Sequence, residues 1–108
     1  MSKYTIGIDY GSLSGRAVLV RCDSGEVEST MDYPHAVMDA ALSDGTPLGQ
    51  DWALQDPQDY LDVLDTVIPA VLRESGVAAE DVIGVGTDFT ACTVLPVKAD
   101  GTPLCFLR

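Results

Sequence analysis

Two apolar segments joined by a short turn of small residues place the strongest constraint on how this chain folds. Residues 4–10 and 16–22 are predicted to form β-strands, with small and hydroxylated residues between them. The first strand ends in a carboxylate, Asp9. The predicted product is a β-hairpin whose tip carries main-chain N–H groups, two serine hydroxyls and one acid.

The chemistry of this tip favours a phosphate and a metal ion. Small residues such as Gly11 allow a phosphate to approach the main chain, and successive N–H groups in a turn form a concave anion site. Asp9 would hold Mg²⁺ directly or through water, because Mg²⁺ prefers oxygen ligands. The turn is not a Walker P-loop, since no Gly-Lys-Ser/Thr follows and it leads into a strand. The alternative is an ordinary hairpin in which Asp9 and Gly11 serve only the turn geometry.

Composition limits the class of protein and its partners. The 108 residues predict one domain or less, and 46% hydrophobic residues are enough for a core. The 17 acidic residues against 6 basic ones give a formal net charge of −11, which disfavours nucleic acid and anionic membranes as partners. Local amides, one arginine and a metal ion still allow a nucleotide to bind.

The cysteines and the histidine suggest no metal or redox site. Cys22, Cys92 and Cys105 lack metal-ligand spacing and predict reduced thiols in a cytoplasmic protein. We find no signal peptide and no membrane-spanning segment, which also favours the cytoplasm. His35 is the only histidine, and a surface or structural role is predicted for it.

The middle of the chain predicts a third strand and a helix. The strand is expected over residues 26–33. The helix begins near Pro57, with Asp56 as its N-cap, and stops at Gly76. Apolar residues recur between them at three- and four-residue spacing, which gives the helix one apolar face. Pro69 interrupts this pattern and predicts a kink or two shorter helices.

A second apolar strand with a polar turn follows the helix. Residues 82–86 are predicted to be a buried strand that ends in a polar turn over 87–93. Further strands are expected over 93–97 and from 103 to 107, with a turn at 99–102. The order indicates an α/β fold with a mixed sheet. If the two apolar strands lie side by side, their turns face one cleft, with a phosphate donor at the first and a small polar acceptor at the second.

Three stretches resemble a known family: residues 4–18, 52–57 and 81–105. They are similar to the N-terminal part of the FGGY carbohydrate kinases, which belong to the superfamily of actin, hexokinase and the heat-shock ATPases. The first stretch is shared loosely by the whole superfamily. The third is more specific and most resembles the kinases that act on L-ribulose. The resemblance covers nearly all 108 residues.

The resemblance implies a ribonuclease H-like, or actin-like, ATPase domain with a hairpin phosphate motif and a crossover helix. It implies ATP and Mg²⁺ as cofactors and L-ribulose or a related pentulose as the sugar substrate, with L-ribulose 5-phosphate as product. A homodimer is implied for the full-length enzyme.

Roles at individual positions also follow from the resemblance. Asp9 matches the metal-associated aspartate, and Arg16 matches an arginine near the transferred phosphate, whose charge would stabilise developing negative charge. The resemblance also assigns roles to two turns. The phosphate-facing turn comprises Gly11, Ser12, Leu13 and Ser14, and the substrate-binding turn comprises Thr90, Ala91 and Cys92. Glycerol kinases carry an Arg-Glu pair where Ala91 and Cys92 stand, so main-chain groups are expected to contact the sugar here.

The family's general base, an aspartate, is expected beyond Arg108, as are the adenine-binding segments. Asp88 is therefore assigned a structural role or a role behind the residues that contact the ligand. Residues 1–108 correspond to the N-terminal portion of the first kinase domain, without the second ATPase domain, and are not expected to turn over alone. Two alternatives stay open: a kinase for another pentulose or polyol, and a truncated binding module without catalytic activity.

Overall fold

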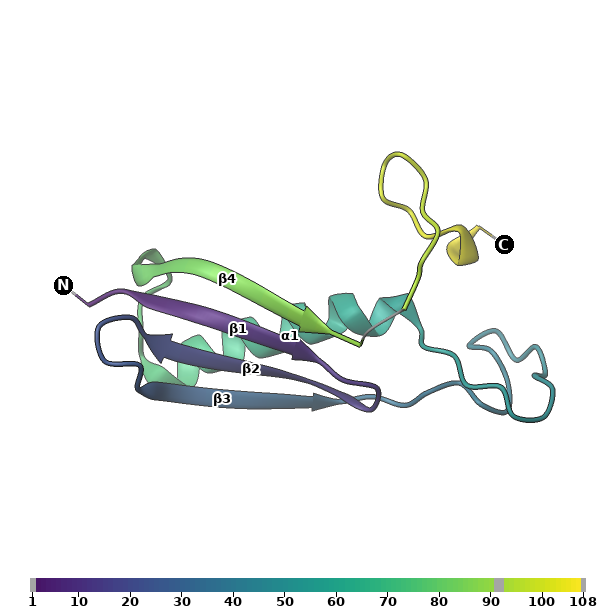
Figure 1. The fold of residues 1–108 in the computed structure, drawn as a ribbon, viewed down its shortest axis with the longest axis horizontal. Coiled ribbons are helices and arrows are strands. Elements are labelled where there is room, and N and C mark those ends of the chain that lie inside the picture. The colour runs from purple at the N-terminus through teal and green to yellow at the C-terminus, as the bar shows by residue number, and fades with distance from the viewer. Residues whose placement is uncertain (1, 91–92, 108) are drawn as a thin grey trace.

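A computed structural model describes residues 2–90 and 93–107. Within them the elements are β1 (Tyr4–Tyr10), β2 (Ser14–Arg21), β3 (Val27–Pro34), α1 (Pro57–Ser75), the 3₁₀ helix η1 (Ala79–Asp81), β4 (Val82–Phe89) and the 3₁₀ helix η2 (Leu104–Phe106). Figure 1 shows four strands side by side with α1 behind them. The predicted hairpin and third strand are confirmed.

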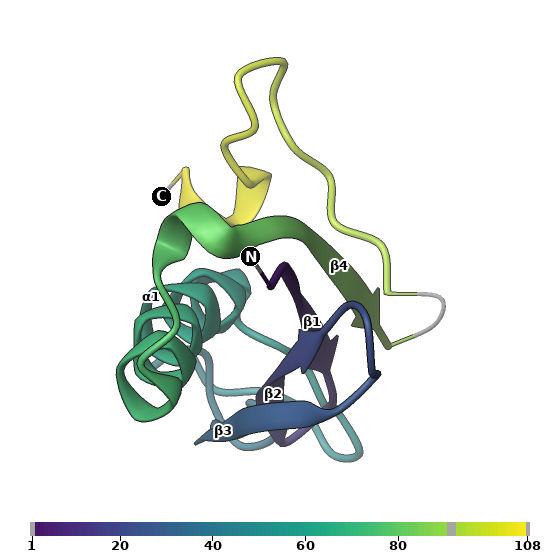
Figure 2. The same cartoon turned by 90° about the vertical axis from the view of Figure 1, so that its left-hand side faces the viewer.

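The sheet is mixed, as predicted. Its order over the described residues is β3-β2-β1-β4, with β1–β2 and β2–β3 antiparallel and β1–β4 parallel. The chain crosses from β3 through α1 to reach the far side of β1 (Figure 2). A parallel pair needs a long crossover of this kind, whereas the antiparallel pairs are joined by short turns. The topology therefore places β4 beside the strand that carries Asp9.

The ends of α1 lie where the sequence predicts them. The Asp56 side chain accepts a hydrogen bond from the Gln58 N–H at 3.0 Å, and Pro57 occupies the first turn. At the other end Gly76 is left-handed, with φ of 73°, and its N–H donates to the Leu72 carbonyl. The helix runs unbroken through Pro69, so the alternative of two shorter helices is wrong. Pro69 has no N–H to donate to the carbonyl of Asp65, four residues earlier. Both residues lie on the exposed face of α1, where water can donate a hydrogen bond to that carbonyl instead.

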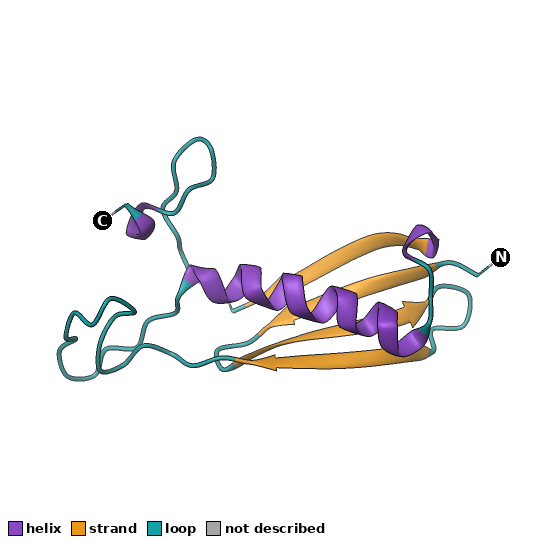
Figure 3. Ribbon diagram, turned by 180° about the vertical axis from the view of Figure 1, so that it is seen from behind, coloured by secondary structure: helices purple, strands orange, loops and turns teal. Residues whose placement is uncertain are grey.

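The core lies between α1 and one face of the sheet (Figure 3). Ile6 and Ile8 of β1 and Leu19 of β2 meet Val63, Val67 and Val71 of α1, and all six are 2% exposed or less. Gly15 is the tightest point of this packing, because a Cβ there would lie 2.4 Å from the Val63 Cγ1. The end of the hairpin next to its turn therefore rests directly on the helix.

Residues 82–86 form a strand as predicted, within β4, but the prediction that this strand is buried is wrong. On β4, Ile83 is 63% exposed, Val85 55% and Phe89 66%. The cause is the position of α1, which packs on β3 and β2 and only lightly on β1. Because β4 lies at the edge of the sheet beyond the helix, its apolar side chains have no covering layer among the described residues.

The predicted strands over 93–97 and 103–107 are also not formed. Val97 makes only an isolated bridge with Pro103, and Leu104–Phe106 form η2. This segment leaves the sheet after β4 (Figure 1), so its backbone has no neighbouring strand to complete a ladder. The turn at 99–102 is confirmed, with Gly101 at φ of 88°.

We expect Gly15→Ala to destabilise the fold by about 1–3 kcal/mol, the usual cost of overpacking a core. The added methyl group has no room against Val63. Urea unfolding followed by circular dichroism measures the change. Gly86→Ala is the matched control, because a Cβ there meets nothing within 4 Å. Equal stability of the two variants would contradict the described contact between hairpin and helix.

Candidate functional site

The hairpin tip is a tight turn with free main-chain donors. The Gly11 N–H donates to the Ser14 carbonyl at 2.9 Å, which closes the turn. Within the described residues, the N–H groups of Ser12 and Leu13 donate to no other group. Ser12 and Leu13 are exposed. The four residues predicted to face phosphate thus form a turn with N–H groups available to an anion.

A row of four charged residues crosses the sheet just behind this turn. The strand register pairs Asp32 with Arg16, Arg16 with Asp9, and Asp9 with Asp88. Residues paired across strands point to the same face. Asp9 alternates with the buried Ile8 and Tyr10, so the row lies on the face opposite α1. The sheet therefore presents one arginine among three carboxylates on its open face.

Arg16 is held by Asp32. Its Nε donates to Asp32 Oδ1 at 2.6 Å, and its Nη2 donates to Oδ2 at 3.3 Å. The hydrogen bond from Arg16 lowers the pKa of Asp32, and the bond to Asp32 raises the pKa of Arg16, with Asp9 adding to that effect. This two-point contact fixes the plane of the guanidinium beside the strand that carries Asp9.

Asp9, the residue predicted to hold a metal ion, has a second carboxylate beside it, Asp88. They are register partners on adjacent parallel strands, and Asp88 Oδ1 accepts the Phe89 N–H at 3.0 Å. No group of three or more His, Cys, Asp or Glu side chains forms a metal cluster in the part of the chain described. This sparse donor set fits Mg²⁺, which binds through one or two carboxylates together with waters and phosphate oxygens.

The second polar turn begins beside the first. Tyr10 of β1 pairs with Phe89 of β4, so the chain leaves both strands at the same edge of the sheet. Thr90 follows directly, and its hydroxyl lies 2.9 Å from that of Thr93. The two strands lie side by side, as the prediction requires, and the shared cleft between their turns stays a prediction. Ala91 and Cys92, the other two residues predicted to bind substrate, lie outside the described residues.

Sequence reasoning missed the contacts that support these side chains. Asp32 was seen only as part of a strand, although its position opposite Arg16 follows once the register of the second hairpin is known. Tyr10 and Tyr60 were also missed. Their rings pack edge to face with centroids 5.0 Å apart, and the Tyr10 hydroxyl donates to the Tyr60 carbonyl at 2.9 Å. Tyr60 in turn donates to Gln55. The end of β1 is thereby tied to the start of α1.

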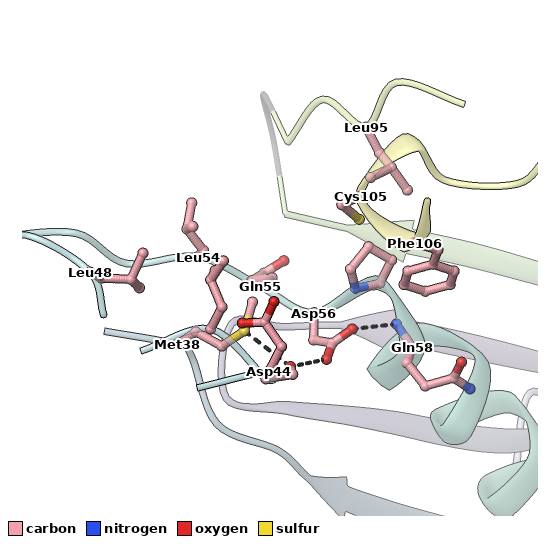
Figure 4. A pocket seen from close by; sticks show the side chains of 13 residues that line it. Met38, Asp44, Leu48, Leu54, Gln55, Asp56, Gln58, Leu95, Cys105 and Phe106 are labelled. Carbon is pink, nitrogen blue, oxygen red and sulfur yellow. Dashed lines mark hydrogen bonds between the residues drawn. The ribbon is translucent and has the colours of Figure 1, made fainter. Parts of the chain in front are cut away.

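A separate apolar cavity lies between residues 36–56, the start of α1 and the segment around η2 (Figure 4). Its volume is about 520 Å³. Asp56 stands in its wall, but its carboxylate already accepts hydrogen bonds from the Ser43 hydroxyl and the Gln58 N–H. None of the predicted site residues lines this cavity in the described part of the chain. The apolar part of its wall includes Met38, Leu42, Leu48, Leu54, Leu95 and Phe106.

Comparison with known proteins shows that the chain is similar to ribulokinases over nearly its whole length. Every similar protein named here is a ribulokinase. The chain is 54% identical over 109 residues to the ribulokinase of Halalkalibacterium halodurans and 58% identical over 105 residues to that of Geobacillus thermodenitrificans. It is 49% identical over 112 residues to the ribulokinase of Mycolicibacterium smegmatis. These matches cover 95–98% of the chain.

The chain spans only 19% of the length of each of these relatives. No family model matches it. The resemblance to ribulokinase indicated by the three stretches is confirmed. Among the described residues, no helix is both long and apolar enough to cross a membrane.

The contact between Arg16 and Asp32 predicts an acid titration. We expect Asp32 to titrate below its ordinary value of 3.8 and Arg16→Gln to move it back up, because the hydrogen bond that favours the carboxylate is lost. The pair's contribution to stability is then present above pH 3.8 and is lost as the pH falls through the lowered pKa. Because both side chains are exposed, that contribution is small.

Carboxyl carbon NMR measures this titration. Asp100 is the internal control, because a backbone hydrogen bond from Thr102 lowers its pKa independently of Arg16. A wild-type Asp32 titrating at 3.8 or above would show that the contact is not formed in solution.

Proposed function

We propose that this chain is the N-terminal portion of the first domain of an FGGY carbohydrate kinase with a ribonuclease H-like, actin-like ATPase fold. The complete enzyme transfers the γ-phosphate of MgATP to L-ribulose and yields L-ribulose 5-phosphate, a step of arabinose catabolism. Similarity to ribulokinases over nearly the whole chain supports this proposal. The small α/β unit with its mixed sheet is compatible with the proposed fold.

One observation carries the proposal: the parallel pairing of β1 with β4 brings a phosphate-type turn and a polar acceptor-type turn to one edge of the sheet. Ligands of open α/β sheets bind beyond the carboxyl ends of the strands. A donor phosphate at Gly11–Ser14 and a sugar at Thr90 and the residues after it would therefore lie next to each other. Phosphoryl transfer depends mainly on such positioning and on charge stabilisation.

Each residue of the site then has a stated task. The N–H groups of Ser12 and Leu13 bind phosphate oxygens, and Asp9 holds Mg²⁺, which neutralises phosphate charge when bound. Arg16 stabilises the negative charge that develops on the transferred phosphoryl group. Thr90 and the main chain at Ala91 and Cys92 bind the sugar. The aspartate that removes the proton from the sugar hydroxyl is proposed to lie beyond Arg108.

The shape of the chain supports its being a piece of a larger domain. Its radius of gyration is 16.4 Å, whereas a compact domain of about 100 residues has roughly 13 Å. The uncovered apolar residues of β4 point the same way. We therefore propose no turnover for residues 1–108 alone. For the complete enzyme we propose a cytoplasmic location and a homodimer.

Turnover by the complete protein tests the proposal. We expect phosphorylation of L-ribulose to exceed that of D-ribulose, D-xylulose and glycerol in kcat/KM. Asp9→Asn should lower kcat by about 10²-fold or more, the usual effect of removing one electrostatic contact to a reacting centre. Asp23→Asn is the matched control, because Asp23 pairs with Arg21 at the opposite end of β2. A wide preference for glycerol or D-xylulose would make the assigned substrate wrong.

A further inference from the structure

The phosphate-facing turn is supported by a residue at the end of β3 for which the sequence predicts only a surface or structural role. His35 follows β3, and its main-chain N–H donates to the Leu13 carbonyl at 2.9 Å. A trans peptide holds its C=O and the next N–H in opposite directions. Holding the Leu13 carbonyl toward β3 therefore turns the Ser14 N–H toward β1, the side on which Asp9 lies.

The His35 side chain is buried against the start of α1. Only 4% of it is exposed, and its Nδ1 lies 3.9 Å from Asp59 Oδ2 in the first turn of the helix. Neither ring nitrogen has a hydrogen-bond partner among the described residues. Burial raises the pKa of Asp59, and the nearby His35 opposes that rise. Burying an imidazole without a hydrogen bond lowers the stability of the fold. We therefore expect a function of the His35 ring that offsets this cost.

We propose that His35 is a positioning residue for the phosphate-facing turn. Its main chain fixes the Leu13 carbonyl, and its imidazole links that point to Asp59 on α1. Together with the close packing of Gly15 on Val63, this gives the hairpin two attachments to the helix, both next to its turn. The turn then holds its N–H groups in place before phosphate arrives. The inference rests on the proposed function, because it concerns the same phosphate.

Two substitutions separate the role of the ring nitrogens from that of the ring volume. His35→Phe fills the space but removes both ring nitrogens, whereas His35→Gln keeps an N–H group facing Asp59. Both keep the main-chain N–H that bonds Leu13. We expect His35→Phe, which loses the contact with Asp59, to raise the Kd for MgATP about tenfold. His35→Gln, which keeps an N–H group there, should raise it by less than about threefold.

The binding constants are measured by calorimetry on the complete protein, and the KM for the sugar is measured alongside. Asp59→Asn should weaken MgATP binding in the same direction, and the His35→Phe/Asp59→Asn pair should be no weaker than His35→Phe alone. Asp65→Asn, on the exposed face of α1, is the matched control and should leave Kd within about twofold. The KM for the sugar should stay unchanged in all of them.

The outcomes separate the two proposals, except where the protein binds no MgATP at all. Equal effects of Phe and Gln at position 35, or a parallel rise in Kd for MgATP and KM for the sugar, would show that His35 only fills space. A wild-type protein that binds MgATP but phosphorylates none of the sugars would overturn the proposed substrate, and the Kd ratios would still decide the role of His35. A wild-type protein that binds no MgATP would overturn both.

Discussion

The parallel pairing of β1 with β4 is the interaction on which the candidate site depends. Without it, the turn after Asp9 and the turn after Asp88 would be remote parts of one chain, separated by 78 residues of sequence. Through it, Tyr10 and Phe89 end their strands at the same level, and two polar turns share one edge. The crossover through α1 makes this pairing feasible and also supplies the layer that buries the inner face of β1.

Few charged residues lie near that edge, and the arginine among them is held in a fixed position. The chain is acidic overall, yet its open sheet face carries an arginine held at two points by Asp32 and flanked by Asp9. A fixed guanidinium loses little freedom when it meets an anion, which is one advantage of a preorganised site. The support comes from the strand beside it, and the helix on the far face supports the hairpin itself. The site is thus assembled from both sides of one sheet.

Much of this arrangement could be predicted from local signals. The first hairpin, the third strand, the Asp56 cap and the Gly76 stop depend on neighbouring residues alone, and the structure places them as expected. The exposure of β4 could not be predicted, because it depends on how far α1 extends across the sheet. Asp32 was missed for a similar reason, since its partner is set by strand register. Residues 93–97 have strand composition, but the described part of the chain offers them no strand to pair with.

The uncovered position of β4 has a consequence for the colloidal behaviour of residues 1–108. An edge strand with Ile83, Val85 and Phe89 exposed offers another copy both backbone groups and apolar surface. Against this stands a formal net charge of −11, which makes copies repel one another. That repulsion reaches about 30 Å at 0.01 M salt and only about 3 Å at 1 M. Ionic strength therefore sets the balance between dispersed and associated chains.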